Sequence, residues 1–460
     1  NGDMTEKQRN KLLAEMTDEV GRLVLRNNYV QTQALSLALA QAPQLLEVHA
    51  RLMRQLEREG DLDPAVEFLP GKEEIDERLL ARQGLTAPEL SVLLAYVKIR
   101  LFKQLLASDL PGDCLRGEEL ANYFPTPLRE RFHKVMPAHR LAPDIISTVL
   151  ANEIVNRAGI TFVYRLREET GAGPADIARA FMIARQIFDM PNVWAEIESL
   201  DNAVAAELQT EMLLEGRKLV ERASRWLLRN RPQPLEVDAN IAYFIEGARS
   251  VAGVMPTRLP QAARDKVQAR VARLGTARVP EALAQRVALY DELLSALDVV
   301  EVAKSEGMSV EDVSAVYFRL DEQLDLHWLR DEVIALPREN RWQALARAAL
   351  RDDLQTQERF LTRDVLRQES ELSDADSRIA AWVTNNAASV KRCRQVLTDL
   401  KSGSKTDFAM LSVAMREIRG LQEGEEAQQQ PAKAAREQKT IESKRKSKGK
   451  SKRKSKGKAA

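Results

Sequence analysis

Apolar residues recur along most of the chain at the three- and four-residue spacing that marks one face of a helix. The clearest case is the stretch from 141 to 185, where the pattern occurs twice. Its first apolar face consists of Ile146, Val149, Leu150 and Ile154. Its second consists of Ile177, Ala180, Phe181, Ala184 and Phe188. A period of 3.6 residues predicts two amphipathic helices here.

The sequence GAGP at 171–174 predicts how these two helices are joined. Gly171 can adopt the left-handed backbone conformation that ends a helix. Pro174 suits the first turn of the next helix, and Asp176 places a carboxylate near its positive N-terminus. The segment is therefore predicted to be a helix, a cap and a second helix.

Capping signals predict where other helices begin. Three pairs have the required spacing: Thr5 with Gln8, Thr86 with Glu89, and Ser309 with Asp312. In each pair the first side chain can accept a hydrogen bond from a backbone N–H of the first turn. The helix after Thr86 has a continuous apolar face, formed by Leu90, Leu93, Leu94, Val97, Leu101 and Leu105.

The N-terminal region is predicted to contain three successive helices. The pair Asn27–Asn28 indicates a break after the first helix, because asparagine favours caps and turns. A second helix over about 29–41 is expected to end near Pro43, because proline cannot donate a backbone hydrogen bond. A third helix should end at Gly60.

The predicted fold class is all-α, a multi-helix bundle-like array with a disordered basic C-terminal tail. The chain is 44% hydrophobic and 30% charged, which is typical of a protein that buries a core. Aromatic residues make up only 5%, and Ala, Leu, Arg and Glu favour helices. The single β-like run, ITFVY at 160–164, is flanked by helical patterns. We expect about fifteen to twenty helices in one or two bundle-like layers.

The chain offers few candidates for a catalytic, cofactor or metal site. The segment GAGPAD at 171–176 begins like a dinucleotide fingerprint, but it lacks the third glycine and a preceding strand, so we interpret it as a helix cap. The histidines have no metal-ligand spacing: His49, His133, His139 and His327. We therefore assign no catalytic, cofactor-binding or metal-binding residue to this chain.

The remaining polar and aromatic residues are interpreted as structural. Acidic side chains scattered among Lys and Arg should form solvated pairs on helix faces. Cys114 and Cys393 have no local partner and are expected to be reduced thiols. The five tryptophans are expected to be core or helix-packing anchors: Trp194, Trp226, Trp328, Trp342 and Trp382. No apolar run is long enough to span a membrane, and the polar first residues do not form a secretory signal.

The formal net charge of +1 conceals a strong asymmetry. Residues 444–460 contain ten Lys or Arg and no acid, which leaves −9 for the rest of the chain. This repeat of KRKSKG has no apolar residues, so it is predicted to be disordered over 426–460. Its charge density could bind a polyanion, although a solvated extension without specific function is the simpler interpretation.

Several segments resemble one protein family in the order in which that family has them. They are MTDEVGRLVLRNNYVQTQALSLA (16–38), GLTAPELSVLLAYVKI (84–99), LANEIVNRAGITFVYRLREETGA (150–172), EGRKLVERASRWLLRNRP (215–232) and TDFAMLSVAMREIRGL (406–421). Together they are similar to the C-terminal helical region of the large bacterial NAD-dependent glutamate dehydrogenases. The resemblance extends to about residue 421.

The resemblance implies a function that no residue pattern here indicates. The parent enzyme would oxidatively deaminate L-glutamate to 2-oxoglutarate and ammonia while reducing NAD, in a bacterial cytoplasm and as a homo-oligomer. Its lysine-activated site and dinucleotide fold would lie upstream of Asn1, so this piece would be catalytically inactive and would serve structure, assembly or regulation. The alternative is a stand-alone helical scaffold protein whose basic tail binds a polyanion.

The resemblance and the composition together predict three regions: a helical junction to the upstream catalytic part at 1–45, an all-α domain at 46–425, and the low-complexity basic tail at 426–460, which is foreign to the family. The first region is unusually rich in apolar residues, including Leu12, Leu13, Val20, Leu23, Val24, Leu25, Tyr29, Val30, Leu35, Leu37 and Leu39. Because Leu23, Val24 and Leu25 are consecutive, at least two helix faces are apolar. One face can pack on the helical domain, and the other is predicted to contact the catalytic part.

Overall fold

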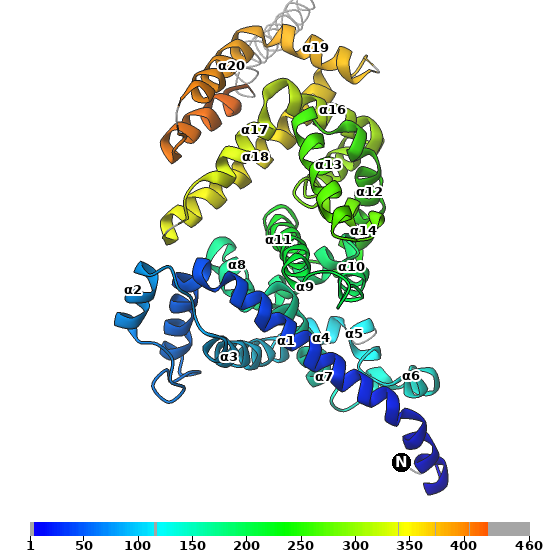
Figure 1. Ribbon diagram of the computed structural model, residues 1–460. Helices are drawn as coiled ribbons and strands as arrows, with labels where there is room; N and C mark the ends of the chain where they lie inside the picture. Colours follow the sequence, from blue (N-terminus) through cyan, green and yellow to red (C-terminus); the bar gives the residue numbers. More distant parts are fainter. Residues whose placement is uncertain (1–3, 115–116, 339, 373, 404, 422–460) are drawn as a thin grey trace, which may run out of the picture. The chain divides into compact units, whose positions relative to one another are not determined.

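The structure, a computed structural model, describes residues 4–114, 117–338, 340–372, 374–403 and 405–421. Within these ranges it is built of helices joined by turns, with no β-strand, so the predicted all-α class is confirmed (Figure 1). None of the helices in this part of the chain combines the length and the apolar composition needed to cross a bilayer. The predicted basic tail, 426–460, lies outside the described residues.

The chain forms two compact units, described separately below. The first comprises residues 1–253 and 264–300, and the second comprises residues 254–263 and 301–460. The helices of the first unit are α1 (Glu6–Arg58), α2 (Lys72–Leu80), α3 (Ala87–Leu106), α4 (Leu110–Asp113), α5 (Glu118–Ala121), α6 (Thr126–Phe132), the 3₁₀ turn η1 (Met136–Ala138), α7 (Ala142–Glu153), the π-helical turn η2 (Ile154–Ala158), α8 (Phe162–Thr170), α9 (Pro174–Ile187), α10 (Met190–Glu198), α11 (Ala206–Asn230) and α14 (Glu281–Ala288).

Three helices contain residues of both units: α12 (Val237–Arg258), α13 (Gln261–Thr276) and α15 (Ser295–Glu306). The helices of the second unit are α16 (Val310–Leu324), α17 (Leu326–Ala335), α18 (Arg341–Gln368), α19 (Ala375–Asn385), α20 (Ala387–Ser402) and a further helix over 408–421.

Helix α1 is one continuous helix of 53 residues, roughly 80 Å long, and runs as a single rod in Figure 1. Its start at the capping box of Thr5 and Gln8 is confirmed. The predicted break at Asn27–Asn28 and the predicted end near Pro43 are both wrong. The two asparagines are exposed on the helix surface, where each costs less than about 1 kcal/mol relative to alanine.

Pro43 lies inside α1 because tertiary packing outweighs its local cost. An interior proline costs about 3 kcal/mol, whereas each fully buried leucine contributes about 1.5–3 kcal/mol. Helix α1 buries four leucines from Leu37 onward: Leu37, Leu46, Leu52 and Leu56. The chain at Gly84 also approaches the helix at this point, where a Cβ atom on Gly84 would lie 2.4 Å from the backbone of Ala42. Only a glycine permits this approach.

Helix α9 is largely buried in the first unit. It packs against α3, α8, α10 and α11. Its predicted apolar residues Ile177, Phe181 and Ala184 are all inaccessible to solvent. Helix α3 also agrees with the sequence, because all six residues of its predicted apolar face are buried and its Thr86–Glu89 capping box is present. Helices α3 and α9 contact each other, and most of the other helices of the first unit pack against one of them.

The stretch 141–185 contains one more helix break than predicted. Gly171 has φ 74° and ends α8, and Pro174 begins α9, so the predicted cap is confirmed. Before it, however, the chain forms α7, a π-helical turn and α8 instead of one helix, because Gly159 has φ 103° and interrupts the helix. The ITFVY run is not a strand, since Phe162 already belongs to α8.

The second unit begins its helical core at the predicted cap: Ser309 accepts a hydrogen bond from the backbone N–H of Asp312 at 3.0 Å. Helix α16 packs against α17, α18 and α19. A buried ionic group joins three of these helices, in which Arg330 pairs with Asp321 at 3.3 Å and with Glu358 at 2.8 Å. Trp382 fills the core and is inaccessible to solvent.

Candidate interface on helix α1

The first half of α1, residues 6–30, carries exposed apolar side chains on its outer side. Four of them are 44–69% exposed: Leu13, Val20, Val24 and Leu25. At about 100° per residue, Leu13, Val20 and Val24 lie within about 40° of one another around the helix axis. They form one apolar stripe, which we call the outer stripe, and Leu25 lies outside it, about 100° from Val24 around the axis.

The side of this half-helix that faces the protein is mainly polar. Five residues at spacings of four, seven, three and four form what we call the inner stripe: Glu15, Glu19, Arg26, Tyr29 and Gln33. The inner stripe is nearly opposite the outer stripe around the axis. Only Leu12 and Met16 are buried among the described residues up to 30. The two buried residues are apolar, as in an ordinary surface helix, but the outer stripe is a second apolar side that stays exposed.

Near the N-terminus, the inner stripe contacts α6. The backbone N–H of Thr126 donates to both carboxylate oxygens of Glu19 at 3.0 Å, and the Thr126 hydroxyl donates at 2.8 Å. Glu19 thus acts as the N-terminal cap of α6, and these hydrogen bonds lower the pKa of its carboxyl group. Arg131 adds a hydrogen bond to Glu15 at 3.0 Å. Figure 1 shows the end of α1 extending beyond α6.

Further along, the inner stripe reaches a buried carboxylate on α10. Glu198 is 9% exposed and accepts hydrogen bonds from Arg26 at 2.5 Å and from Arg157 at 2.7 Å. Arg157 also donates to Gln33 at 2.9 Å. Its guanidinium lies 4.7 Å from the ring centroid of Trp194, within cation–π range. We call Arg26, Gln33, Arg157, Trp194 and Glu198 the Glu198 cluster.

Two further contacts hold α1 near residue 30. Burial and a hydrogen bond to Asp201 raise the pKa of Tyr29 to about 12, so its phenol stays protonated at neutral pH. Lys98 on α3 donates to Gln31 at 3.0 Å, and its partial burial lowers its pKa to about 8. The first half of α1 is therefore held mainly by hydrogen bonds and ion pairs, whose geometry is specific.

The second half of α1 packs in the usual way. It buries Ala34, Leu37, Ala38, Ala42, Leu46, Ala50, Leu52, Met53 and Leu56. His49 is buried among them, and its Nδ1 has no hydrogen-bond partner in the described structure. Burial, together with the positive charge of Arg165, lowers the pKa of His49 to about 4. This imidazole is therefore neutral at physiological pH.

Arg217 on α11 is a buried cation beside the second half of α1. Its guanidinium donates to the carbonyl oxygens of Arg157 at 3.0 Å and Asn156 at 3.4 Å, and to Gln41 at 3.3 Å. The two carbonyls belong to the π-helical turn η2, whose C-terminal end attracts positive charge. Burial nevertheless lowers the pKa of Arg217 to about 10. The side chain caps this turn and connects it to α1.

Comparisons with known proteins agree with the resemblance seen in the sequence. The family model described as glutamate dehydrogenase, C-terminal, matches residues 82–420. The chain belongs to this family. A second model, described as bacterial NAD-glutamate dehydrogenase, catalytic domain, matches residues 1–38.

Three curated relatives are similar over nearly the whole chain, and each is an NAD-specific glutamate dehydrogenase. The protein from Pseudomonas aeruginosa is 43% identical over 91% of this chain. The proteins from Halomonas elongata and Mycobacterium tuberculosis are 39% and 37% identical over 92% and 91% of it. The chain spans 26% of the length of each of these relatives.

One of the two family boundaries lies inside α1. The segment matched by the catalytic-domain model ends at residue 38, inside the helix, and contains the whole of the outer and inner stripes. The residues that the inner stripe contacts, such as Thr126, Arg157 and Glu198, belong to the C-terminal family segment. Helix α1 therefore continues past the end of the catalytic-domain segment to Arg58, and the C-terminal family segment begins at residue 82, after α2.

The other candidates from the sequence do not come together as a site. Gly171 and Gly173 flank the boundary between α8 and α9, as the cap interpretation predicted. Both cysteines are unpaired and buried, and burial raises the pKa of Cys114 to about 12 and of Cys393 to about 11. In the described ranges, no group of three or more His, Cys, Asp or Glu has an arrangement that could hold a metal ion.

The interpretation of the tryptophans is correct for four and wrong for one. Trp194, Trp226 and Trp382 are buried, and Trp328 is partly buried beneath Lys401. Trp342 is 74% exposed and anchors nothing in this structure. The expected helical periodicity does not distinguish an inward from an outward position at the start of α18.

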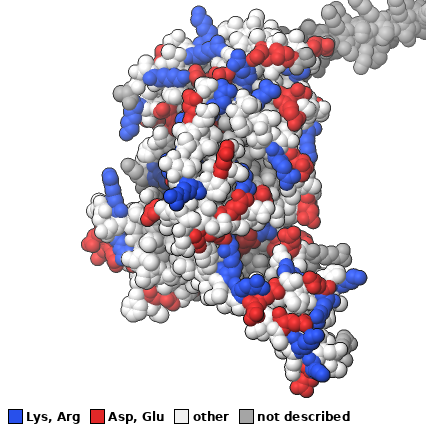
Figure 2. Space-filling view, turned by 45° about the vertical axis from the view of Figure 1, so that its right-hand side comes forward, with Lys and Arg blue, Asp and Glu red and all other residues white. Residues whose placement is uncertain are grey.

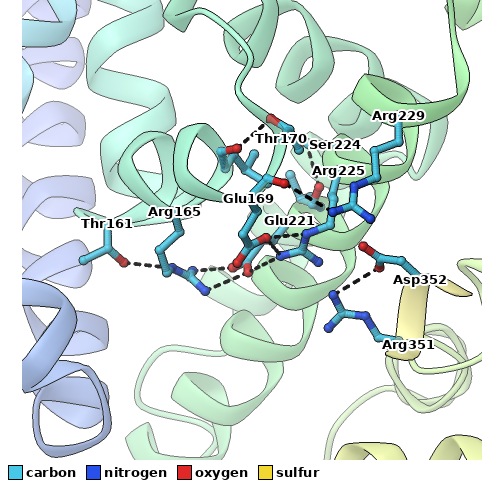
Figure 3. Close-up of polar contacts among 12 residues, drawn as sticks. Thr161, Arg165, Glu169, Thr170, Glu221, Ser224, Arg225, Arg229, Arg351 and Asp352 are labelled. Carbon is cyan, nitrogen blue, oxygen red and sulfur yellow. Dashed lines mark hydrogen bonds and ion pairs between the residues drawn. The ribbon is translucent and has the colours of Figure 1, made fainter. Parts of the chain in front are cut away.

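Many charged residues that were predicted to form solvated pairs are buried in ion pairs. Arg165 on α8 binds Glu221 on α11 through both terminal nitrogens, and Arg225 binds Glu169 (Figure 3). Arg225 is 3% exposed. Such pairs join residues 56 positions apart, so spacing along a single helix could not predict them. On the face drawn in Figure 2, the exposed Lys and Arg are interspersed with Asp and Glu.

One small pocket lies between α1, α3 and α8. Its walls are mainly apolar and include Leu52, Leu101 and Val163, with Arg100 and Arg167 among its polar residues. Its volume is about 40 Å³, whereas pockets for drug-sized ligands have roughly 300–1,000 Å³. This pocket is too small for a dinucleotide or an amino acid.

Proposed function

We propose that this chain is the C-terminal helical part of an NAD-dependent glutamate dehydrogenase. The parent enzyme oxidatively deaminates L-glutamate to 2-oxoglutarate and ammonia and reduces NAD. The names of the relatives and the family description support this activity for the parent. The chain itself serves structure, assembly or regulation, while the NAD and glutamate sites lie in the catalytic part.

The first half of α1 is the junction to that catalytic part, within the proposed region 1–45. The observation that carries this proposal is the outer stripe, since an apolar face of this size on a charged helix is typical of a contact surface. Its occupant is the remainder of the same chain, because the catalytic-domain model matches the residues that carry the stripe. The matched 420 residues are 26% of the Pseudomonas relative, which is therefore about three and a half times as long as this chain and has ample protein to cover the stripe.

Substituting Leu25 in the full-length enzyme tests the junction. Leu25→Asp should lower kcat by at least fivefold, because it would bury an unpaired carboxylate between α1 and the catalytic part. Leu80→Asp is the matched control, since Leu80 is an exposed leucine of α2 that lies outside the segment matched by the catalytic-domain model. NADH formation from glutamate is measured for both. Equal activities of the two variants would refute the junction.

Three properties of the parent remain proposals that rest on the resemblance or the sequence alone. We propose a cytoplasmic homo-oligomer, in line with the family to which the chain belongs. We further propose that the basic segment at 444–460 contacts a polyanion, which its ten Lys and Arg would bind through counterion release.

A further inference from the structure

The Glu198 cluster is where the two family segments are most specifically connected. Arg26 and Gln33 come from the segment matched by the catalytic-domain model, whereas Arg157, Trp194 and Glu198 come from the C-terminal family segment. One carboxylate thus holds two guanidinium groups that are 131 positions apart in the chain, from Arg26 on α1 and from Arg157 on η2. Arg26 and Arg157 donate to different carboxylate oxygens of Glu198, so the orientation of this carboxylate is fixed.

The pair of Glu198 with Arg157 is buried, whereas the Arg26 side chain, which links the pair to α1, is 44% exposed. The side chains of Glu198 and Arg157 are only 7% and 9% exposed, so water does not compete strongly for them. Trp194 covers the guanidinium of Arg157 on one side. Arg26 in turn lies over the ring of Tyr29, at 5.5 Å from its centroid. The cluster therefore specifies the rotation of α1 about its own axis more tightly than apolar contacts, which are not directional, would do.

That rotation decides where the outer stripe points. Leu13, Val20 and Val24 lie on the opposite side of the helix from Arg26, and a continuous helix transmits any turn at one side to the other. The proposed catalytic part docks on this stripe, so its orientation depends on the cluster. A displacement of about 1 Å at reacting groups can lower a rate up to a hundredfold, even when its cause is distant.

We propose that Glu198 is a positioning residue for the dehydrogenase reaction: it fixes the helical phase of α1 and thereby the placement of the catalytic part. This inference rests on the proposed function. In this proposal Glu198 acts through α1, and the reacting groups belong to the catalytic part.

The test uses the full-length enzyme with Glu198→Gln, which keeps the shape of the side chain but removes its charge. We expect kcat to fall five- to tenfold while the KM values for glutamate and NAD change less than twofold. Arg26→Gln should also lower kcat, and the double variant should be no worse than Glu198→Gln alone, because the Arg26 pair is one of the two that Glu198→Gln removes. Amide exchange over residues 6–30 should become faster in Glu198→Gln.

A matched control separates positioning from stability. Glu119 has a side chain 7% exposed and pairs with Arg185, and both residues lie within the C-terminal family segment. Glu119→Gln should therefore destabilise the protein to a similar extent but leave kcat unchanged below the melting temperature. Equal losses of kcat in Glu119→Gln and Glu198→Gln would overturn the positioning role, and so would full activity of both. If Leu25→Asp lowers kcat but Glu198→Gln does not, the proposed function stands and this inference fails.

Discussion

The two halves of α1 belong to one uninterrupted helix but differ in how much of their apolar surface is buried. Residues 34–58 turn Leu37, Leu46, Leu52 and Leu56 toward the protein, as expected of a surface helix. Residues 6–30 turn the inner polar stripe toward the protein and leave Leu13, Val20, Val24 and Leu25 exposed. Both halves are therefore fully helical, but only the second half buries most of its apolar side chains.

This difference indicates that the two halves of α1 have different partners for their apolar side chains. The second half of α1 finds its apolar partners in this chain, among them α3 and α11. The first half finds polar partners in this chain, and its apolar side still faces solvent. The segment matched by the catalytic-domain model ends at residue 38, close to the boundary between the two halves.

The largest expected effect is a difference in the free energy of unfolding between two leucine-to-alanine substitutions, one in each half of α1. Leu46 is inaccessible to solvent, so Leu46→Ala should lower the free energy of unfolding by about 2–5 kcal/mol. Leu25→Ala should change it by less than about 0.5 kcal/mol, because Leu25 is 69% exposed. Chemical denaturation of the chain measures both. If the two substitutions were equally costly, the contrast between the two halves would be lost.

Acid should act on the second half through His49. Its pKa is lowered from 6.5 to about 4 in the folded protein, so the unfolded chain binds the proton more readily. The stabilising contribution of neutral His49 is complete above about pH 6.5 and is lost as the pH falls toward 4. The loss amounts to about 3 kcal/mol.

His49→Leu provides the comparison for this pH effect, because it keeps a buried side chain and removes the titrating group. The difference in free energy of unfolding between wild type and variant should change with pH only between about 6.5 and 4. Chemical denaturation at a series of pH values measures it. A difference that is constant over this range would contradict a buried, neutral His49.

The smallest expected effect is a difference in local unfolding between the first half of α1 and α3. Amide exchange should be roughly tenfold faster over residues 6–30 than over α3, residues 87–106, because the first half of α1 buries few apolar side chains. In the full-length enzyme the same amides should become slower, since the catalytic part then covers the outer stripe. If residues 6–30 and α3 exchanged at equal rates in this chain alone, the first half of α1 would not have an uncovered apolar side.

The sequence predicted the helices best where local chemistry decides. The caps at Thr5, Thr86, Gly171 and Ser309 use hydrogen bonds or backbone conformations within a few residues, and all four are present. At Pro43 the local preference is opposed by contacts of α1 with residues far along the chain, such as Gly84. A single sequence does not reveal those contacts, so the predicted helix end there was wrong.

The candidate interface was predictable only in part. The consecutive Leu23, Val24 and Leu25 indicated more than one apolar face on the first half of α1. The inner stripe was missed, because its partners Thr126 and Glu198 are more than 100 positions away. Its signal was nevertheless present, since charged and polar residues recur at helical spacing opposite the apolar ones. This spacing predicts a polar face, but not that the polar face turns inward.

The distance of 172 positions between Arg26 and Glu198 has a consequence for biosynthesis. At roughly 5–20 residues per second, a ribosome makes Glu198 about 10–35 s after Arg26. During that interval the inner stripe of the nascent helix lacks Glu198, and its partners on α6 and η2 are made only in the later part of it. The proposed catalytic part would already have been translated, so the outer stripe would be covered first. Each new molecule of the parent enzyme would then assemble the C-terminal helices onto a half-helix that is already docked.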